Sequence, residues 1–180
     1  MKKSLLFGSL ILLVLLLLGG GWALNQQHQP TQATTATTKP NKPKRPNNLL
    51  TVTELKQHEK LRYAAIIYYA LKYTKLQRWQ EASDFKAGWQ VEVYPHHGHP
   101  QYLVWPDQNT TDQDKNLEPN RFKLTAKQTV TYNSFIVHSF SKDMTQATRL
   151  TKIAATISQH HKGRAVRQMV PNLTVKNHHN

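Results

Sequence analysis

The chain has 180 residues, and its 24 lysine and arginine side chains outnumber its 10 aspartates and glutamates, for a formal net charge of +14. It contains no cysteine, which excludes disulfides, a thiol nucleophile, a thiolate metal site and a lipid anchor attached through cysteine. All acidic residues lie between Glu54 and Asp143, so both ends of the chain are basic. Such ends favour anionic partners such as phospholipid headgroups, wall polymers or nucleic acid, although net charge also serves solubility alone.

The first 24 residues have the composition of an export signal or a membrane anchor. Lys2 and Lys3 precede Leu5–Leu24, a run of 20 residues without a charge. At about 1.5 Å per residue, this run is long enough for a hydrocarbon core of about 30 Å. Cleavage after Ala23, as in a signal peptide, is the alternative. We favour the uncleaved single-pass anchor, because the lysines mark the cytoplasmic side and Trp22 suits the outer interface. In either case the rest of the chain is expected outside the membrane.

Residues 25–48 are predicted to form a disordered linker. They are rich in Thr, Pro, Lys and Asn, with no aromatic residue. Four prolines interrupt any regular element, and the segment has too little apolar surface to offset the entropy lost on ordering. Extended as polyproline, it would reach about 70 Å from the membrane.

Residues 49–180 contain the apolar residues for a single folded domain. Thr51 and Glu54 match a capping box, which predicts a helix from this point to about Tyr73. Because Ala64–Leu71 is apolar nearly all round, this helix is expected to be covered on more than one side. Alternating apolar residues and turn signals then predict the following elements: a short helix over residues 79–85 ending near Gly88, an antiparallel hairpin of strands 89–94 and 101–105, strands over 121–125 and 128–140, and a last strand over 166–175.

A second amphipathic helix is predicted to begin at Met144. Asp143 and Gln146 match a capping box. The expected apolar stripe consists of Met144, Ala147, Leu150, Ile153, Ala154 and Ile157. Gly163 is expected to stop this helix, with His160, His161 and Lys162 in its last turn. The order of helix, strands, helix and strand predicts the α+β class with a mainly antiparallel sheet.

The histidines His96, His97 and His99 form the first candidate site. Three imidazoles within four residues are a potential ligand set for Zn, Cu or Ni. They fall on the predicted hairpin tip between prolines, and a tight metal site also needs fixed geometry. We therefore prefer a solvated loop over a metal site. No P-loop or dinucleotide fingerprint is present, and we expect no cofactor.

Basic residues near the C-terminus form the second candidate site, for an anionic polymer. Residues 144–180 carry no acid. The candidate contacts are Arg149, Lys152, Lys162, Arg164 and Arg167. Without a recognisable nucleic-acid-binding module, we expect no specific nucleic-acid partner. A further hypothesis from composition is that most of the ten histidines gain charge near pH 5 and so strengthen binding to polyanions in an acidifying medium.

The alternative function from another class is a small cell-wall or glycan hydrolase. Such an enzyme needs two carboxyl groups across a cleft, for which Asp84, Glu92 and Asp107 are the candidates nearest to aromatic residues. The aromatic residues that would stack on sugar rings are Trp79, Trp89, Tyr94, Tyr102 and Trp105. We prefer to place these side chains in the core, and no catalytic constellation stands out.

The chain resembles uncharacterised exported, membrane-anchored proteins of lactic-acid bacteria. The similar segments are the leucine-rich N-terminus, the Thr/Pro/Lys linker, the helix around Ala64–Ala70, the Trp89 strand, and the C-terminal helix and strand. The resemblance covers most of residues 49–180 and rests on hydrophobic pattern. It implies a surface location and a small α+β domain, and carries no activity to any residue. We therefore expect a non-enzymatic, membrane-anchored domain that contacts the cell wall or another extracytoplasmic partner.

Overall fold

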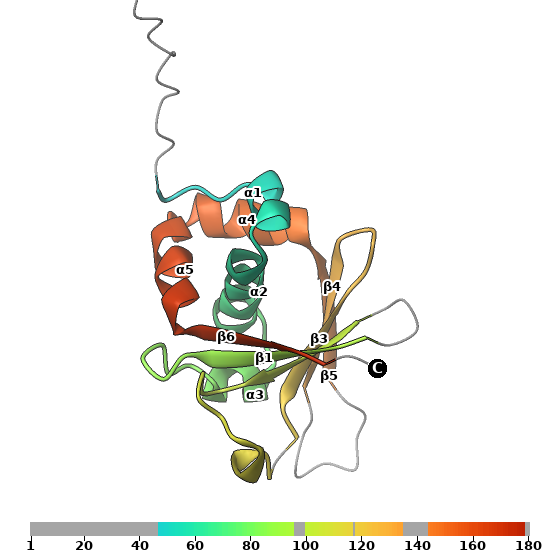
Figure 1. Ribbon diagram of the computed structural model, residues 1–180. Coiled ribbons are helices and arrows are strands. Elements are labelled where there is room, and N and C mark those ends of the chain that lie inside the picture. The colour runs from blue at the N-terminus through green and yellow to red at the C-terminus, as the bar shows by residue number, and fades with distance from the viewer. Residues whose placement is uncertain (1–46, 96–99, 117, 135–143, 179–180) are drawn as a thin grey trace, which may run out of the picture. The chain divides into compact units, whose positions relative to one another are not determined.

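The computed structural model describes residues 47–95, 100–116, 118–134 and 144–178. The helices and strands of this part form one α+β domain (Figure 1). The helices are α1 (Val52–Gln57), α2 (Glu59–Tyr73), α3 (Gln77–Glu81), α4 (Leu150–Gln159) and α5 (Gly163–Met169), with 3-10 turns η1 (Asp112–Asp114) and η2 (Val170–Asn172). The strands are β1 (Trp89–Tyr94), β2 (Gln101–Trp105), β3 (Asn120–Leu124), β4 (Thr129–Ser134), β5 (Met144–Arg149) and β6 (Leu173–Asn177).

The strands form a six-stranded sheet in the order β5-β4-β3-β2-β1-β6. Neighbouring strands are antiparallel except β1 and β6, which are parallel and pair from Trp89 with Leu173 to Val93 with Asn177. The predicted class and the mainly antiparallel sheet are therefore confirmed. The predicted hairpin is also confirmed, with Gln90 opposite Trp105 and Tyr94 opposite Gln101.

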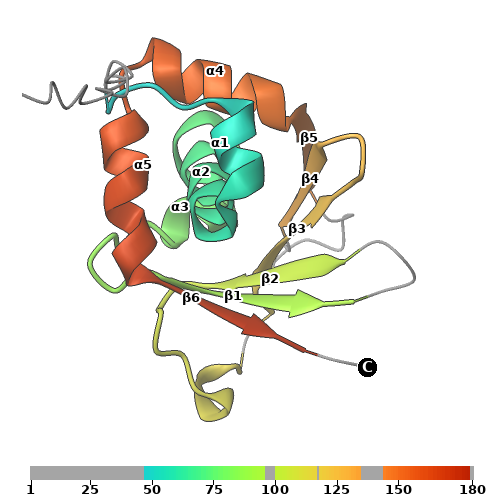
Figure 2. The same cartoon turned by 45° about the horizontal axis from the view of Figure 1, so that its top comes forward.

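Helix α2 is the centre of the core. Every residue from Tyr63 to Leu71 is buried, because the sheet covers one side of the helix and α1, α4 and α5 cover others (Figure 2). Tyr63 packs its ring 5.3 Å from that of Tyr102 on β2. Tyr132 on β4 donates its hydroxyl hydrogen to the backbone oxygen of Ile66 at 3.0 Å. The expected burial of this helix on several sides is confirmed.

The predicted helix from Thr51 to Tyr73 is two helices. The N-cap is confirmed, since the Thr51 hydroxyl oxygen accepts a hydrogen bond from the Glu54 N–H at 3.2 Å. The helix is interrupted at His58, whose extended backbone (φ −120°, ψ 99°) separates the end of α1 from the start of α2. Because of this interruption, α1 packs on α4 as well as on α2. The short helix α3 ends at Glu81, before the Phe85 that was predicted to belong to it.

The prediction of a helix from Met144 onward is wrong for its first six residues. Met144–Arg149 form β5, which pairs antiparallel with β4 along its whole length. The helix begins at Leu150, and the apolar stripe is buried from there on, through Ile153, Ala154 and Ile157. The capping residue Asp143 lies outside the described residues.

The end of this helix and the last strand also differ from the prediction. Helix α4 ends at Gln159, and the chain turns at His161, which has a positive φ of 55°. His160, His161 and Lys162 therefore follow α4, and Gly163 begins α5 instead of ending α4. The strand predicted over 166–175 is confirmed only from Leu173, because α5 and η2 occupy the residues before it.

Candidate functional site

Four of the five predicted polyanion contacts are exposed on or beside α4 and α5. Arg149 ends β5, Lys152 lies in the first turn of α4, Lys162 joins the two helices, and Arg164 lies in the first turn of α5. Ten helical residues extend about 15 Å, so the cations gather at the two ends of α4. We call these four residues the α4–α5 surface. His160 and His161 are exposed between Lys162 and the end of α4.

No acidic residue occurs in the chain between Met144 and His178, so no neighbour in the sequence neutralises these cations. Many acids of the described part lie on α3, the turn after it and the loop between β2 and β3. Figures 1 and 2 place that loop, which contains η1, at the opposite end of the domain from α4. The α4–α5 surface therefore lies at the other end of the domain from these acids.

The fifth predicted contact, Arg167, is occupied by internal partners. Its guanidinium group donates to the backbone oxygens of Asn47 at 2.7 Å and Leu49 at 3.0 Å, and lies 2.6 Å from a carboxylate oxygen of Glu54. Only 30% of the Arg167 side chain is exposed. Arg167 therefore fixes the start of the domain, and we leave it out of the α4–α5 surface.

Replacing Arg167 with glutamine should destabilise the domain by about 1–2 kcal/mol, because hydrogen bonds of a charged donor are lost at three acceptors that are partly shielded from water. Urea unfolding followed by tryptophan fluorescence measures this change. Arg164→Gln, on the exposed side of the same helix, is the control and should leave the free energy of unfolding within about 0.5 kcal/mol. Equal effects of the two substitutions would contradict the internal role of Arg167.

The segment Asn47–Leu50 joins the domain at α4 and α5. The Ser158 hydroxyl group in α4 accepts a hydrogen bond from the Leu50 N–H at 2.8 Å and donates one to the Leu50 carbonyl at 3.0 Å. The Gly163 N–H donates to the Asn48 carbonyl at 3.1 Å, and a methyl group on Gly163 would approach that oxygen to 2.5 Å. The first described residues, Asn47–Leu50, are therefore held against α4 and α5.

The candidate metal ligands His96, His97 and His99 lie outside the described residues. Within residues 47–95, 100–116, 118–134 and 144–178, no group of three or more His, Cys, Asp or Glu side chains is arranged to hold a metal ion.

Most of the aromatic residues considered for sugar stacking are in the core. Trp79 and Trp89 are fully buried, and their indole N–H groups donate to backbone oxygens of Asn133 at 3.2 Å and Ala82 at 2.9 Å. The Tyr102 ring stacks on Phe122 at 4.5 Å between centroids. Tyr94 is 36% exposed, and its ring stacks on His178 at 4.1 Å. The core placement that we preferred for Trp79, Trp89 and Tyr102 is confirmed.

Glu92, one of the candidate catalytic acids, is a buried ion-pair partner. Its side chain is 1% exposed on the sheet face opposite to the helices. The Lys115 ammonium group lies 2.6 Å from one carboxylate oxygen, and the Tyr94 hydroxyl donates to the other at 3.0 Å. Gln90 adds an amide hydrogen bond at 3.0 Å. Sequence analysis missed Lys115, since 22 residues separate it from Glu92 and no pattern marks a lysine that folds over a sheet.

The carboxyl groups near these residues favour the charged form. Burial raises the pKa of Glu92, but the hydrogen bonds from Lys115 and Tyr94 outweigh burial and hold the pKa below its usual value. Backbone N–H groups of Ala87 and Lys86 lower the pKa of Asp84. The general acid of a glycosidase instead needs a raised pKa. Glu92 and Asp84 therefore do not have the raised pKa that the general acid of a glycan hydrolase needs.

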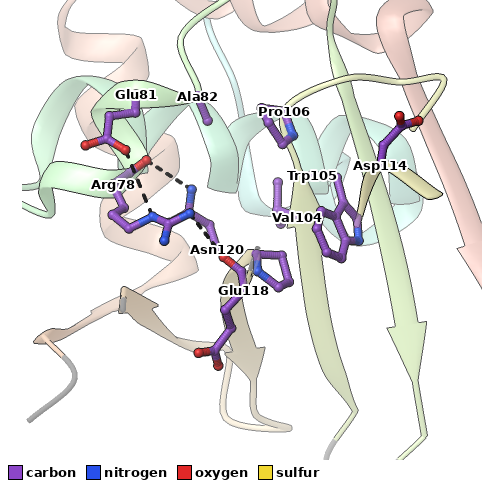
Figure 3. Close-up of a pocket in the computed structure, with 10 residues that line it drawn as sticks. Arg78, Glu81, Ala82, Val104, Trp105, Pro106, Asp114, Glu118 and Asn120 are labelled. Carbon is purple, nitrogen blue, oxygen red and sulfur yellow. Dashed lines mark hydrogen bonds and ion pairs between the residues drawn. The ribbon is translucent and has the colours of Figure 1, made fainter. Parts of the chain in front are cut away.

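A pocket of about 190 Å³ lies between α3, the end of β2 and the start of β3 (Figure 3). Trp105 and Pro106 line one side, and Arg78 and Asn120 the other. The Arg78 guanidinium group donates to the Glu118 carbonyl at 3.1 Å, and the Asn120 amide donates to the Arg78 carbonyl at 3.1 Å. Trp105 is thus the one aromatic candidate that lines this pocket.

Comparisons with protein-family models, with curated proteins and with solved structures found no match to this chain.

Proposed function

We propose that this protein is a membrane-anchored extracytoplasmic domain whose α4–α5 surface binds an anionic polymer of the cell wall or cell surface. The supporting observation is that Arg149, Lys152, Lys162 and Arg164 are each exposed, in a part of the chain without acids. Exposed cations at the two ends of a helix about 15 Å long suit a flexible polymer with repeated anionic groups.

The sequence just before the domain also supports this proposal. Asn47–Leu50, the first described residues, are bound to α4 and α5. Lys42, Lys44 and Arg45 come shortly before them in the sequence and add to the positive charge of the chain.

The membrane anchor itself remains a proposal from the sequence. The charge-free run Leu5–Leu24 lies outside the described residues. Among the helices of the described part, none combines the length and the apolar character that crossing a membrane requires. We propose that Leu5–Leu24 is retained as a single-pass anchor, with secretion after cleavage at Ala23 as the alternative.

Neutralising three cations of the α4–α5 surface should weaken binding to wall polymer about tenfold, because each exposed ionic contact contributes about 0.5 kcal/mol. The measurement is cosedimentation of residues 47–180 with cell-wall sacculi that retain or lack teichoic acid, at rising salt. The test variant is Lys152→Gln/Lys162→Gln/Arg164→Gln. The matched control is Lys75→Gln/Lys86→Gln/Lys123→Gln, which removes the same charge from exposed lysines outside α4 and α5.

Binding that needs teichoic acid, falls with salt and is weakened in the test variant alone would support the proposal. If the two variants lose affinity equally, net charge rather than the α4–α5 surface drives binding. If the wild-type fragment does not sediment with sacculi of either kind, the proposal fails. Release of soluble sugar fragments from the sacculi would instead favour the hydrolase.

A further inference from the structure

The turn between α4 and α5 contains two exposed histidines, His160 and His161, directly before Lys162. Backbone hydrogen bonds hold this turn on the last carbonyl groups of α4. The His160 N–H donates to the Thr156 carbonyl at 3.1 Å, and the His161 N–H donates to the Ser158 carbonyl at 3.0 Å. Both histidines therefore lie at the C-terminal end of a helix of 10 residues, where the helix dipole favours positive charge.

The side chains nearest to this turn also favour a positive charge or add to it. The Tyr73 ring, at the end of α2, lies 5.3 Å from the His160 ring, a distance at which an aromatic ring attracts a cation. Lys162 and Arg164 supply exposed cations on the side of α5. Strand β5, which also packs on α4, contains no acid.

The two helices that pack on α4 carry one acid each, and both acids have other partners. Glu54 of α1 pairs with Arg167 at 2.6 Å. Glu59 accepts a hydrogen bond from the Tyr63 hydroxyl group at 2.8 Å. Glu59 begins α2 and Tyr73 ends it, so the 15 residues of this helix, about 22 Å, separate Glu59 from the turn. A charge gained at the turn is therefore available to an external anion.

The other two histidines of the described part have a carboxylate beside them. His58 lies between α1 and α2 and directly precedes Glu59. The His178 Nε2 atom lies 3.6 Å from a carboxylate oxygen of Glu92. A charge gained at either of these positions is offset by its acidic neighbour, and neither position adjoins the α4–α5 surface.

We propose that His160 and His161 make the α4–α5 surface responsive to acid, so that protonation of the two imidazoles strengthens binding of the anionic polymer. This proposal rests on the proposed function and adds the regulation of the same surface. Histidine is the side chain that ordinarily changes charge between about pH 8 and pH 5. Two more exposed ionic contacts beside Lys162 should together raise the affinity about fivefold.

The experiment compares binding at two pH values at one ionic strength. The full chain, held in nonionic detergent, is sedimented with sacculi that retain teichoic acid at about pH 7.5 and about pH 5.5, a range in which histidine changes charge but aspartate and glutamate ordinarily do not. We expect the wild-type affinity to be about fivefold higher at the lower pH. Dextran sulfate, titrated calorimetrically, is the second probe. Its sulfate esters stay ionised, so the same rise with this polymer places the change in the protein.

Three variants assign the rise to this turn, and circular dichroism checks that each is folded. The test variant is His160→Gln/His161→Asn, because asparagine tolerates the positive φ of 55° at position 161. Its affinity should rise less than about twofold. The control, His58→Gln/His178→Gln, removes two histidines outside the surface and should keep the full rise. His160→Lys/His161→Lys has both charges at either pH, so it should bind at the higher pH as tightly as the wild type does at the lower pH.

The outcomes separate this proposal from the proposed function. If the wild type binds sacculi equally at both pH values, or if the test variant keeps the rise or the control loses it equally, the role of His160 and His161 is overturned and the proposed function stands. A rise with sacculi but not with dextran sulfate also overturns that role, because the change then lies in the wall. If the wild type sediments with sacculi at neither pH, the proposed function itself fails.

Discussion

Gly88→Ala should be among the most destabilising single substitutions in the domain, at about 3 kcal/mol or more. Gly88 has a φ of 76°, in the left-handed region that costs an L-residue about 1–2 kcal/mol. A methyl group at this position would also lie 2.0 Å from the backbone oxygen of Asn172. The oxygen belongs to η2, which leads into β6, so the clash cannot be relieved by rotating a side chain. The start of β1 and the start of β6 would have to separate.

Thermal unfolding followed by circular dichroism measures this effect. For a domain of this size we expect the midpoint to fall by about 10 °C. Ser83→Ala, an exposed position in the preceding turn, is the control and should change the midpoint by less than about 2 °C. A Gly88→Ala midpoint within that same margin would show that the close approach of Asn172 to Gly88 is not maintained in solution.

Glu92→Gln is expected to lower the free energy of unfolding by about 2–3 kcal/mol. Removing one partner of a buried ion pair usually costs about 3–5 kcal/mol, because the other charge stays buried and unpaired. Here the loss is smaller, because Lys115 is 16% exposed and also pairs with Asp112, whose side chain is 93% exposed. The loop that carries Lys115 would still be held over the sheet, but less firmly.

A double-mutant cycle with Lys115→Met separates the ion pair from general packing. Lys115→Met alone leaves the Glu92 carboxylate buried without its cation, so it should also be destabilising. Glu92→Gln/Lys115→Met should be less destabilising than the sum of the single substitutions, by about 1–2 kcal/mol. Additive effects in urea unfolding would contradict direct coupling between the two side chains.

The same pair makes the stability of the domain depend on pH in a defined direction. The pKa of Glu92 in the folded state is below its ordinary value of 4.5. Its contribution is therefore complete above pH 4.5 and is lost as the pH falls through the folded-state pKa. The difference in unfolding free energy between wild type and Glu92→Gln should therefore shrink as the pH falls below 4.5.

Local patterns predicted the elements that are defined by local interactions. The strands Trp89–Tyr94 and Gln101–Trp105 agree with the structure residue for residue, since apolar and polar residues alternate there between turn signals. The N-cap at Thr51 was also readable, because its hydrogen bond joins residues only three positions apart. The burial of helix α2 was predictable because its residues are apolar on nearly all sides.

The errors occur where contacts distant in the sequence decide the structure. Met144–Arg149 has residues compatible with a helix, but pairing with all of β4 makes it a strand. In the sequence, Arg167 resembles a surface cation. In the structure it binds Asn47 and Glu54, which lie more than 110 residues earlier in the chain. For the candidate sites, the sequence indicated a basic C-terminal part. It gave no sign that Trp105 and Asn120 would line one pocket from adjacent strands.

The parallel pairing of β1 with β6 has a consequence for the order in which the domain is completed. β1 begins at Trp89 and its partner at Leu173, so 83 residues must be made before the two strands can meet. Until then, the first strand of the hairpin has an open edge with unpaired backbone groups, which is a site for association with other chains. Synthesis of the last residues therefore covers the edge of β1, and β6 becomes the edge strand of the finished sheet. A chain truncated before Leu173 would keep the hairpin and expose this edge permanently.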